Sequence, residues 1–428
     1  MREDGAAWAH PCPRRRKILT PFERRCQVRD LTGPYPRSGY LDWAGETMRR
    51  LVCATATAGL AVTALAITPA AAAPAAGSAE ASRWAPVPVA RHLDNPRQLD
   101  LTSDGVLVIA ESGTGGDDCA DVGGETVCVG TTGAVSIVRH PAKVAGVTAQ
   151  RVVTGLLSEA GPSGAGATGN DAASARTLGR IYIAKDVDVP DGITGLPEEQ
   201  EGRLLRAAAG RPPVVVADIR AFEAANDPDG QGVESNPYSV LDVGDKVLVA
   251  DAAANAVLAV DKRGRISVFA VLPTITGGAC DTRPNQDGSY SCDPVPTALS
   301  FSRDGDVIVG GLGSLVPGAG RVWELDRRTG AVQQTWTGFT GVTGAAQDRA
   351  GNLYVSELFG GGGSGQVVLV PRKGERAALP APSPAGVVTD AFGNVYVAVN
   401  SLSPGTGTGA PDSDGQVWRL TERSFPAG

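Results

Sequence analysis

Histidine, methionine and excess positive charge are all scarce in this sequence. Its 428 residues include 3 histidines and 2 methionines, and 39 Lys and Arg against 46 Asp and Glu give a net charge of −7. The missing basic excess argues against a generic nucleic-acid binder. After residue 72 the histidines are His92 and His140. Because there is also no G-x-S-x-G elbow, serine hydrolase chemistry has little support.

The first 72 residues have the pattern of an export signal. Met48-Arg49-Arg50 is a short basic segment, residues 51–67 are apolar and uncharged, and small residues follow at 68–73. This order predicts a secretory signal peptide over 48–72, cleaved after Ala72. An uncleaved anchor is the alternative, but an apolar run of roughly 17 residues is marginal for a membrane span. We therefore expect a secreted, extracellular protein without a stable membrane span after cleavage.

Residues 1–47 precede that signal and fit it poorly. The segment is basic and patternless, and Met48 is the other methionine. We interpret 1–47 as a leader that arises from a start assigned too early, with translation beginning at Met48; a long, unusual leader is the alternative. Without residues 1–72 the chain holds 28 basic and 40 acidic residues, for a net charge of −12.

Four cysteines remain after residue 72, an even number that indicates two disulfides in a secreted chain. The sequence allows three pairings. The spacing favours two local bridges, Cys119–Cys128 and Cys280–Cys292, each closing a loop rich in Gly and Asp. A metal site is the weaker alternative, because neither pair is C-x-x-C and histidine is scarce.

Six internal copies of one pattern follow one another along the chain. Each has an apolar run, then an Asp-Gly or Gly-Asn turn, then a run rich in Val, Ile and Tyr, which is a hairpin signature. Third and fourth runs follow most copies. The copies are aligned on Ala110, Ala184, Ala250, Gly310, Ser356 and Ala398. Four strands repeated six times predict an all-β, six-bladed β-propeller over 84–422, with a tail at 423–428. Helical repeats have similar periods, but the period-2 runs disfavour them.

The ends of the chain predict how the ring closes. The last copy lacks its fourth strand, and an extra strand at 84–90 precedes the first copy. We expect this N-terminal strand to complete the last blade and remove the open edges. The long connections all lie between the second and third strands or between blades, so one face carries the variable loops and is the expected functional face.

Polar residues at two recurring positions form the candidate site on that face. Asn95, Arg97, Asn170 and Asn236 open inner strands, while Glu111, Asp251 and Glu357 end second strands, with Asn400 nearby. A ring of Glu111, Asn236, Asp251 and Glu357 could hold a hard cation such as Ca²⁺. The alternative is structural, with the acidic side chains bonding backbone groups of a neighbouring blade. Residues 226–230 suggest a calcium loop but lack the spaced ligands of an EF-hand, so we interpret them as a turn after a short helix at 220–225.

Several of these segments resemble the ScyD/ScyE family. They are Leu93–Arg97, Ile109–Gly113 with the pair Cys119 and Cys128, Gly166–Gly169, Phe222–Gly230 and Ser235–Tyr238. The resemblance extends over about 84–422 and is specific only in combination. It implies an exported propeller related to NHL and lactonase-type repeats, of a type common in actinomycetes, and it implies no reaction.

These observations favour a monomeric binding protein whose unknown extracellular ligand or partner docks on the long-loop face. The alternative is a metal-dependent hydrolase or lactonase-like enzyme at the channel mouth, with calcium as its cofactor. A propeller lyase or quinone dehydrogenase ranks lower, because such sites usually need a histidine or several arginines at the mouth.

Overall fold

The computed structural model describes residues 85–285 and 288–425. The predictions of a leader at 1–47 and a signal peptide at 48–72 concern residues outside this part, as does the end of the tail. Within the described residues, none of the helices is long and apolar enough to cross a membrane.

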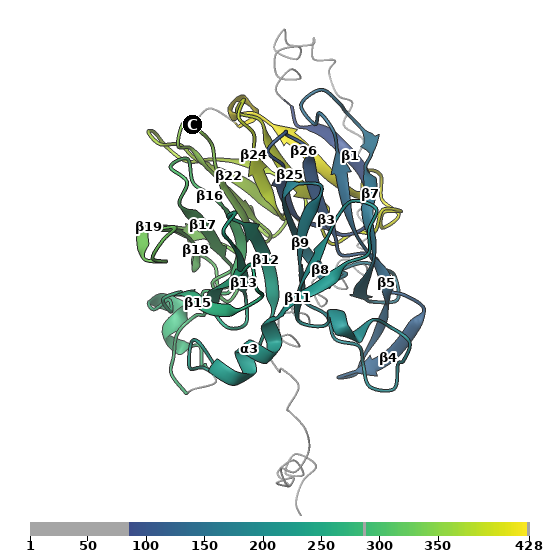
Figure 1. Cartoon of the computed structure of the whole chain (residues 1–428). Coiled ribbons are helices and arrows are strands. Elements are labelled where there is room, and N and C mark those ends of the chain that lie inside the picture. The colour runs from purple at the N-terminus through teal and green to yellow at the C-terminus, as the bar shows by residue number, and fades with distance from the viewer. Residues whose placement is uncertain (1–84, 286–287, 426–428) are drawn as a thin grey trace, which may run out of the picture. The chain divides into compact units, whose positions relative to one another are not determined.

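Six antiparallel sheets follow one another along the chain (Figure 1). Blade 1 contains β2 (Pro96–Leu101), β3 (Leu107–Glu111), β5 (Glu125–Val138) and β7 (Gln150–Ala160), with β4 (Asp118–Val122) as an addition. Blade 2 contains β8 (Asn170–Thr177), β9 (Arg180–Lys185), β10 (Arg203–Ala207) and β11 (Val214–Asp218). Blade 3 contains β12 (Pro237–Asp242), β13 (Lys246–Asp251), β14 (Ala256–Asp261) and β15 (Ile266–Val271).

The remaining three sheets repeat the same order. Blade 4 contains β16 (Pro296–Phe301), β17 (Val307–Gly311), β18 (Gly320–Leu325) and β19 (Val332–Phe339). Blade 5 contains β20 (Val342–Gln347), β21 (Leu353–Glu357), β22 (Gln366–Val370) and β23 (Ala377–Pro380). Blade 6 contains β24 (Val387–Thr389), β25 (Val395–Val399), β26 (Gly415–Leu420) and β1 (Val87–Leu93). Helices are few in the described part: α3 (Ile219–Asn226), η1 (Glu198–Gln200), η2 (Gly278–Thr282) and η3 (Glu422–Ser424).

The sheets form a closed ring. The first strands of consecutive blades contact one another in the order β2, β8, β12, β16, β20 and β24, and β24 contacts β2 again. The predicted six-bladed propeller is confirmed. Its predicted closure is also confirmed: β1 pairs antiparallel with β26, with Val87 opposite Arg419 and Leu93 opposite Gly415. Arg91 of β1 reinforces this junction through an ion pair of 2.8 Å with the buried carboxylate of Asp414.

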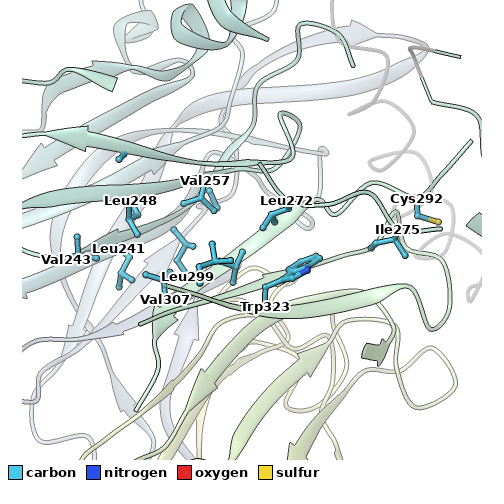
Figure 2. Packing of buried hydrophobic residues seen from close by; sticks show 14 of the residues in the cluster. Leu241, Val243, Leu248, Val257, Leu272, Ile275, Cys292, Leu299, Val307 and Trp323 are labelled. Atoms are coloured by element: carbon cyan, nitrogen blue, oxygen red, sulfur yellow. The ribbon is translucent and has the colours of Figure 1, made fainter. Parts of the chain in front are cut away.

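The hydrophobic core is divided among the blade interfaces. In the described part, six clusters of buried side chains each join two neighbouring blades. Figure 2 shows the cluster between blades 3 and 4, where Trp323 packs beside Leu272 and Leu299. Alternate residues of a strand point to opposite sheet faces, and both faces are buried: in β13, Leu248 and Ala250 belong to the cluster with blade 4, whereas Val247 and Val249 belong to the cluster with blade 2. Burial between blades therefore holds the ring together.

Blade 1 departs from the predicted pattern. The segment 112–132, expected as a loop, contains β4 and the first half of β5, which pair as a hairpin in which Cys119 lies opposite Cys128. The connection 139–149 is longer than the short turn expected there, and within it β6 (Val147–Thr148) pairs parallel with β1. A period-2 pattern does not show where one strand extends beyond its own blade.

Apart from 139–149, the long connections lie on one face, as predicted, and include the β4 hairpin and α3, both at the lower edge of Figure 1. Both predicted disulfides are present, Cys119–Cys128 and Cys280–Cys292. Cys292 belongs to the core cluster between blades 3 and 4 (Figure 2), so the second bridge attaches the connection 272–295 to the core.

Candidate functional site

The three acidic residues predicted for the mouth share one structural role. Each ends the second strand of its blade, and its carboxylate accepts a hydrogen bond from the backbone N–H just ahead of that blade's first strand. The donor-to-acceptor distances are 2.8 Å for Asp94 N to Glu111, 2.6 Å for Asn236 N to Asp251 and 2.7 Å for Thr340 N to Glu357. The structural alternative holds, but the partner lies in the same blade rather than in the neighbouring one.

The asparagines are also engaged in the scaffold. Asn95 donates to Gly113 O and Gly164 O, both at 2.8 Å, and thereby ties the blade 1–blade 2 connection to the mouth. Asn400 donates to two carbonyls of the connection before β26. Asn170 donates to backbone carbonyls of blade 1, and its Oδ1 has no hydrogen-bond partner. Most of the predicted polar residues thus stabilise loops.

The predicted cation ring of Glu111, Asn236, Asp251 and Glu357 is not formed. In the part of the chain that the structure describes, no three His, Cys, Asp or Glu side chains are arranged to hold a metal ion. Glu111 instead accepts a hydrogen bond from Ser136 Oγ and two from Arg151, with an Nη2–Oε2 distance of 2.8 Å. The carboxylates were expected to converge because they are equivalent in the repeat, but each one turns into its own blade.

A recurrent bulge brings other side chains to the channel. In blades 1 to 5 the pairing register shifts at the residue after the start of the first strand. A bulge re-aims side chains, and such irregularities are frequent at functional positions. The residues at this position, here called the bulge ring, are Arg97, Asp171, Tyr238, Thr297 and Thr343.

The bulge ring differs between its two halves. Thr297 and Thr343 donate to carbonyls of the next blade, at 2.7 Å to Val342 O and 2.8 Å to Pro384 O. In blades 1 to 3 the same position carries Arg97, Asp171 and Tyr238 in place of threonine. Bonding between blades requires only a threonine at this position, so the charged and phenolic side chains of blades 1 to 3 need another explanation.

Gln98 closes the channel beside the bulge ring. Its amide nitrogen donates to Thr297 O at 2.9 Å and Thr343 O at 2.7 Å, which joins blade 1 to blades 4 and 5. Gln98 is buried. A ligand that enters from the long-loop face therefore meets a polar floor at this level.

A charged cluster occupies the mouth between blades 1, 2 and 3. We name Arg97, Asp171, Lys185, Asp186 and Tyr238 the mouth cluster.

Arg97 and Asp171 are its paired charges. Arg97 Nε lies 3.4 Å from Asp171 Oδ1, and Ser112 Oγ donates to that same oxygen at 3.0 Å. Thr168 Oγ1 donates to Asp171 Oδ2 at 3.3 Å, and Arg97 also donates to Ala167 O. This pair is therefore internally compensated.

The other three members lie in an unfavourable environment for charge. Burial lowers the pKa of Lys185 to about 7, although Asp171 and Asp186 act in the opposite direction; its Nζ donates to Leu157 O at 2.5 Å. Burial, then the charge of Asp171, raises the pKa of Asp186 well above its ordinary value. Burial raises the pKa of the partly exposed Tyr238 to about 12. Strongly shifted groups gathered in one place are typical of functional sites.

Of the mouth cluster, Arg97 was predicted from the sequence and the other four members were not. Asp171 and Tyr238 lie one or two residues beyond the predicted Asn170 and Asn236, at the bulge that no residue pattern marks. Lys185 could have been found from the repeat. It follows Ala184 as Glu111 follows Ala110, so a base replaces an acid at the equivalent position of blade 2.

A second group of carboxyls lies between blades 2 and 3. Glu223 of α3 is 0% exposed, and burial, followed by the charges of Asp251, Asp229 and Asp227, raises its pKa to about 8. The helix ends at Asn226, and Asp227 adopts a left-handed conformation as its C-cap, so the predicted turn at 226–230 is confirmed. A small polar cavity lies beside this turn, and Glu234, Asn255 and Asn285 are among its lining residues.

Comparison with known proteins finds no match among protein-family models or curated proteins. Solved structures with a similar arrangement include the PQQ-bound aldose sugar dehydrogenase of Streptomyces coelicolor, with 12% identity and TM-score 0.43 over 78% of this chain and 96% of that chain. A streptogramin B lyase has 11% identity and TM-score 0.42 over 80% and 97%. A putative glucose dehydrogenase of Thermus thermophilus has 16% identity and TM-score 0.45 over 79% and 99%. This likeness gives no basis for an activity, and membership of the ScyD/ScyE family stays a prediction.

Proposed function

We propose that this protein is a secreted propeller that binds a small polar ligand at the mouth cluster without transforming it. The observation that carries the proposal is the asymmetry of the bulge ring, which has threonines in blades 4 and 5 but Arg97, Asp171 and Tyr238 in blades 1 to 3. A site used only to join blades would not need a buried pair of charges and a phenol, because burying charge is costly.

The chemistry of the cluster favours a neutral, hydroxyl-bearing ligand. Arg97 and Asp171 already compensate each other, so a ligand with net charge would leave a charge unpaired. Tyr238 is partly exposed, and its hydroxyl can both donate and accept a hydrogen bond. The metal-dependent hydrolase has lost its main support, because Glu111 and Glu357 are committed to bonds within their blades.

Calorimetric titration of the purified protein with three ligand panels tests this function. The panels are neutral polyols and saccharides, amines, and carboxylates. We expect heat of binding from members of the neutral panel only. Tyr238→Phe should weaken that binding about tenfold, because one hydrogen bond to a polar ligand is lost.

The matched control is Phe392→Ser, which changes an aromatic residue that is 90% exposed in the turn before β25, on the opposite face. It should bind like the unaltered protein. The proposal fails if no panel gives heat, or if Tyr238→Phe binds as tightly as the unaltered protein.

A further inference from the structure

Glu223 is an unusual carboxylate even for this acidic protein. It is 0% exposed, and neither of its oxygens has a hydrogen-bond partner. The backbone N–H of Glu234 lies close enough to affect its charge, but not in hydrogen-bonding geometry. A buried charge is normally paired or coordinated to a metal, so a compensating group is required here.

The neighbouring side chains supply more acceptors and no positive charge. Asp251, Asp229 and Asp227 are the charged groups that act on Glu223. None of these four carboxylates forms an ion pair with a Lys, Arg or His among the described residues. The three aspartates accept hydrogen bonds from neutral donors: Asn236 N and Ser235 Oγ bond Asp251, Asn255 Nδ2 bonds Asp229, and Gly232 N bonds Asp227. Glu223 has no such donor, so it requires a proton or a positive ligand.

Asn236 provides a second, independent unpartnered group. It is 9% exposed, its Oδ1 has no hydrogen-bond partner, and its backbone N–H bonds Asp251 Oδ1 at 2.6 Å. Asn236 Oδ1 and the Glu223 carboxylate both lack donors; the backbone of Asn236 bonds Asp251, and the charge of Asp251 acts on Glu223. Oxygen ligands of this mixed type suit Ca²⁺, which accepts six to eight oxygens in flexible geometry.

We propose that a calcium ion binds between α3 and the end of β13, with Glu223, Asp251 and Asn236 Oδ1 as its side-chain ligands. Since no three carboxylates are gathered around one point in the described part of the chain, backbone oxygens and water complete the coordination shell. The ion joins a helix of the blade 2–blade 3 connection to the end of β13. This site shares Asn236 and Asp251 with the predicted four-residue ring, but Glu223 takes the place of Glu111 and Glu357.

Calcium-dependent thermal melting of the full chain, first stripped with EDTA, tests the site. We expect CaCl₂ to raise the melting temperature with half-saturation between about 10⁻⁴ and 10⁻³ M, the range of extracellular modules. MgCl₂ should act far more weakly, because Mg²⁺ requires a strict octahedral shell. Glu223→Gln should abolish the calcium response, and Glu324→Gln, a carboxyl change on β18 of blade 4, should leave it unchanged.

A second variant covers the case in which Glu223→Gln does not fold. Asn236→Asp adds a carboxylate at a ligand position and should tighten calcium binding severalfold. The proposal is overturned if the unaltered protein shows no shift at about 10 mM CaCl₂, well above the expected half-saturation. It is also overturned if Glu223→Gln keeps the shift, or if Asn236→Asp leaves the half-saturation concentration unchanged. A protein whose melting responds to pH but not to calcium would show that a proton occupies the site instead.

Discussion

Lys185→Met should change the stability of the protein in opposite directions at low and high pH. Burial lowers the pKa of Lys185 from 10.5 to about 7 in the folded state. The folded chain therefore holds this proton less tightly than the unfolded chain, so the cost of burying the ammonium is complete below pH 7 and disappears as the pH rises toward 10.5. At about 1.4 kcal/mol per pKa unit, the full cost is about 5 kcal/mol.

Methionine has nearly the same length and carries no proton, but it loses the hydrogen bond to Leu157 O. Leaving that buried carbonyl unpaired costs about 1–3 kcal/mol. We therefore expect Lys185→Met to be about 2–4 kcal/mol more stable than the unaltered protein at pH 6 and about 1–2 kcal/mol less stable at pH 10.

Urea unfolding of both proteins from pH 6 to 10 measures this difference, and the titration of groups that do not interact with Lys185 cancels in it. The control is Lys262→Met, an exposed lysine in the turn before β15, which should stay within about 0.5 kcal/mol at every pH. A difference for Lys185→Met that does not vary with pH would refute the argument, since the ammonium would then not be desolvated on folding.

Three further changes test the scaffold. Gln98→Ala leaves two channel carbonyls without their donor and should lower the free energy of unfolding by about 2–3 kcal/mol in urea titrations. A loss under about 0.5 kcal/mol would mean that water replaces the amide. Replacing Cys280 and Cys292 together by alanine should lower the free energy of unfolding by about 3 kcal/mol relative to the oxidised protein, the loop-closure value for a sequence separation of 12. Equal stability would contradict a role of this disulfide in the core. Val89→Asp places a charge at a fully buried position of the closing strand and should abolish cooperative melting in calorimetry, whereas a normal melting transition would show that β1 is dispensable.

The architecture could be predicted because each repeat is marked by short, local sequence patterns. Turn pairs such as Asp104-Gly105 and Gly393-Asn394, each between runs of alternating residues, mark the hairpins. The absence of a fourth strand after Leu420 predicted the closing strand, which the pairing of β1 with β26 confirms. Counting strands was sufficient for these features, because each strand needs a partner.

The site could be predicted only in part, because side-chain partners depend on three-dimensional neighbours. Glu111 and Glu357 were placed correctly at strand ends, yet their carboxylates bond inside the blade. Tyr238 reaches the mouth through a bulge, a one-residue irregularity that reverses which side of the strand faces the channel. Burial of Lys185 likewise depends on segments distant in sequence, since its Nζ bonds Leu157 O of β7 and lies beside Gly169, which residue type alone does not reveal.

The pairing of β1 with β26 also determines how the ring responds to mechanical force. The two strands are antiparallel, with Val87 at the start of one opposite Arg419 at the end of the other. A force that pulls residues 87 and 420 apart therefore acts at one end of the ladder, whose hydrogen bonds run perpendicular to the strands. The bonds are loaded one after another rather than together. The pairing that closes this ring should consequently unzip at low tension when force is applied to residues 87 and 420.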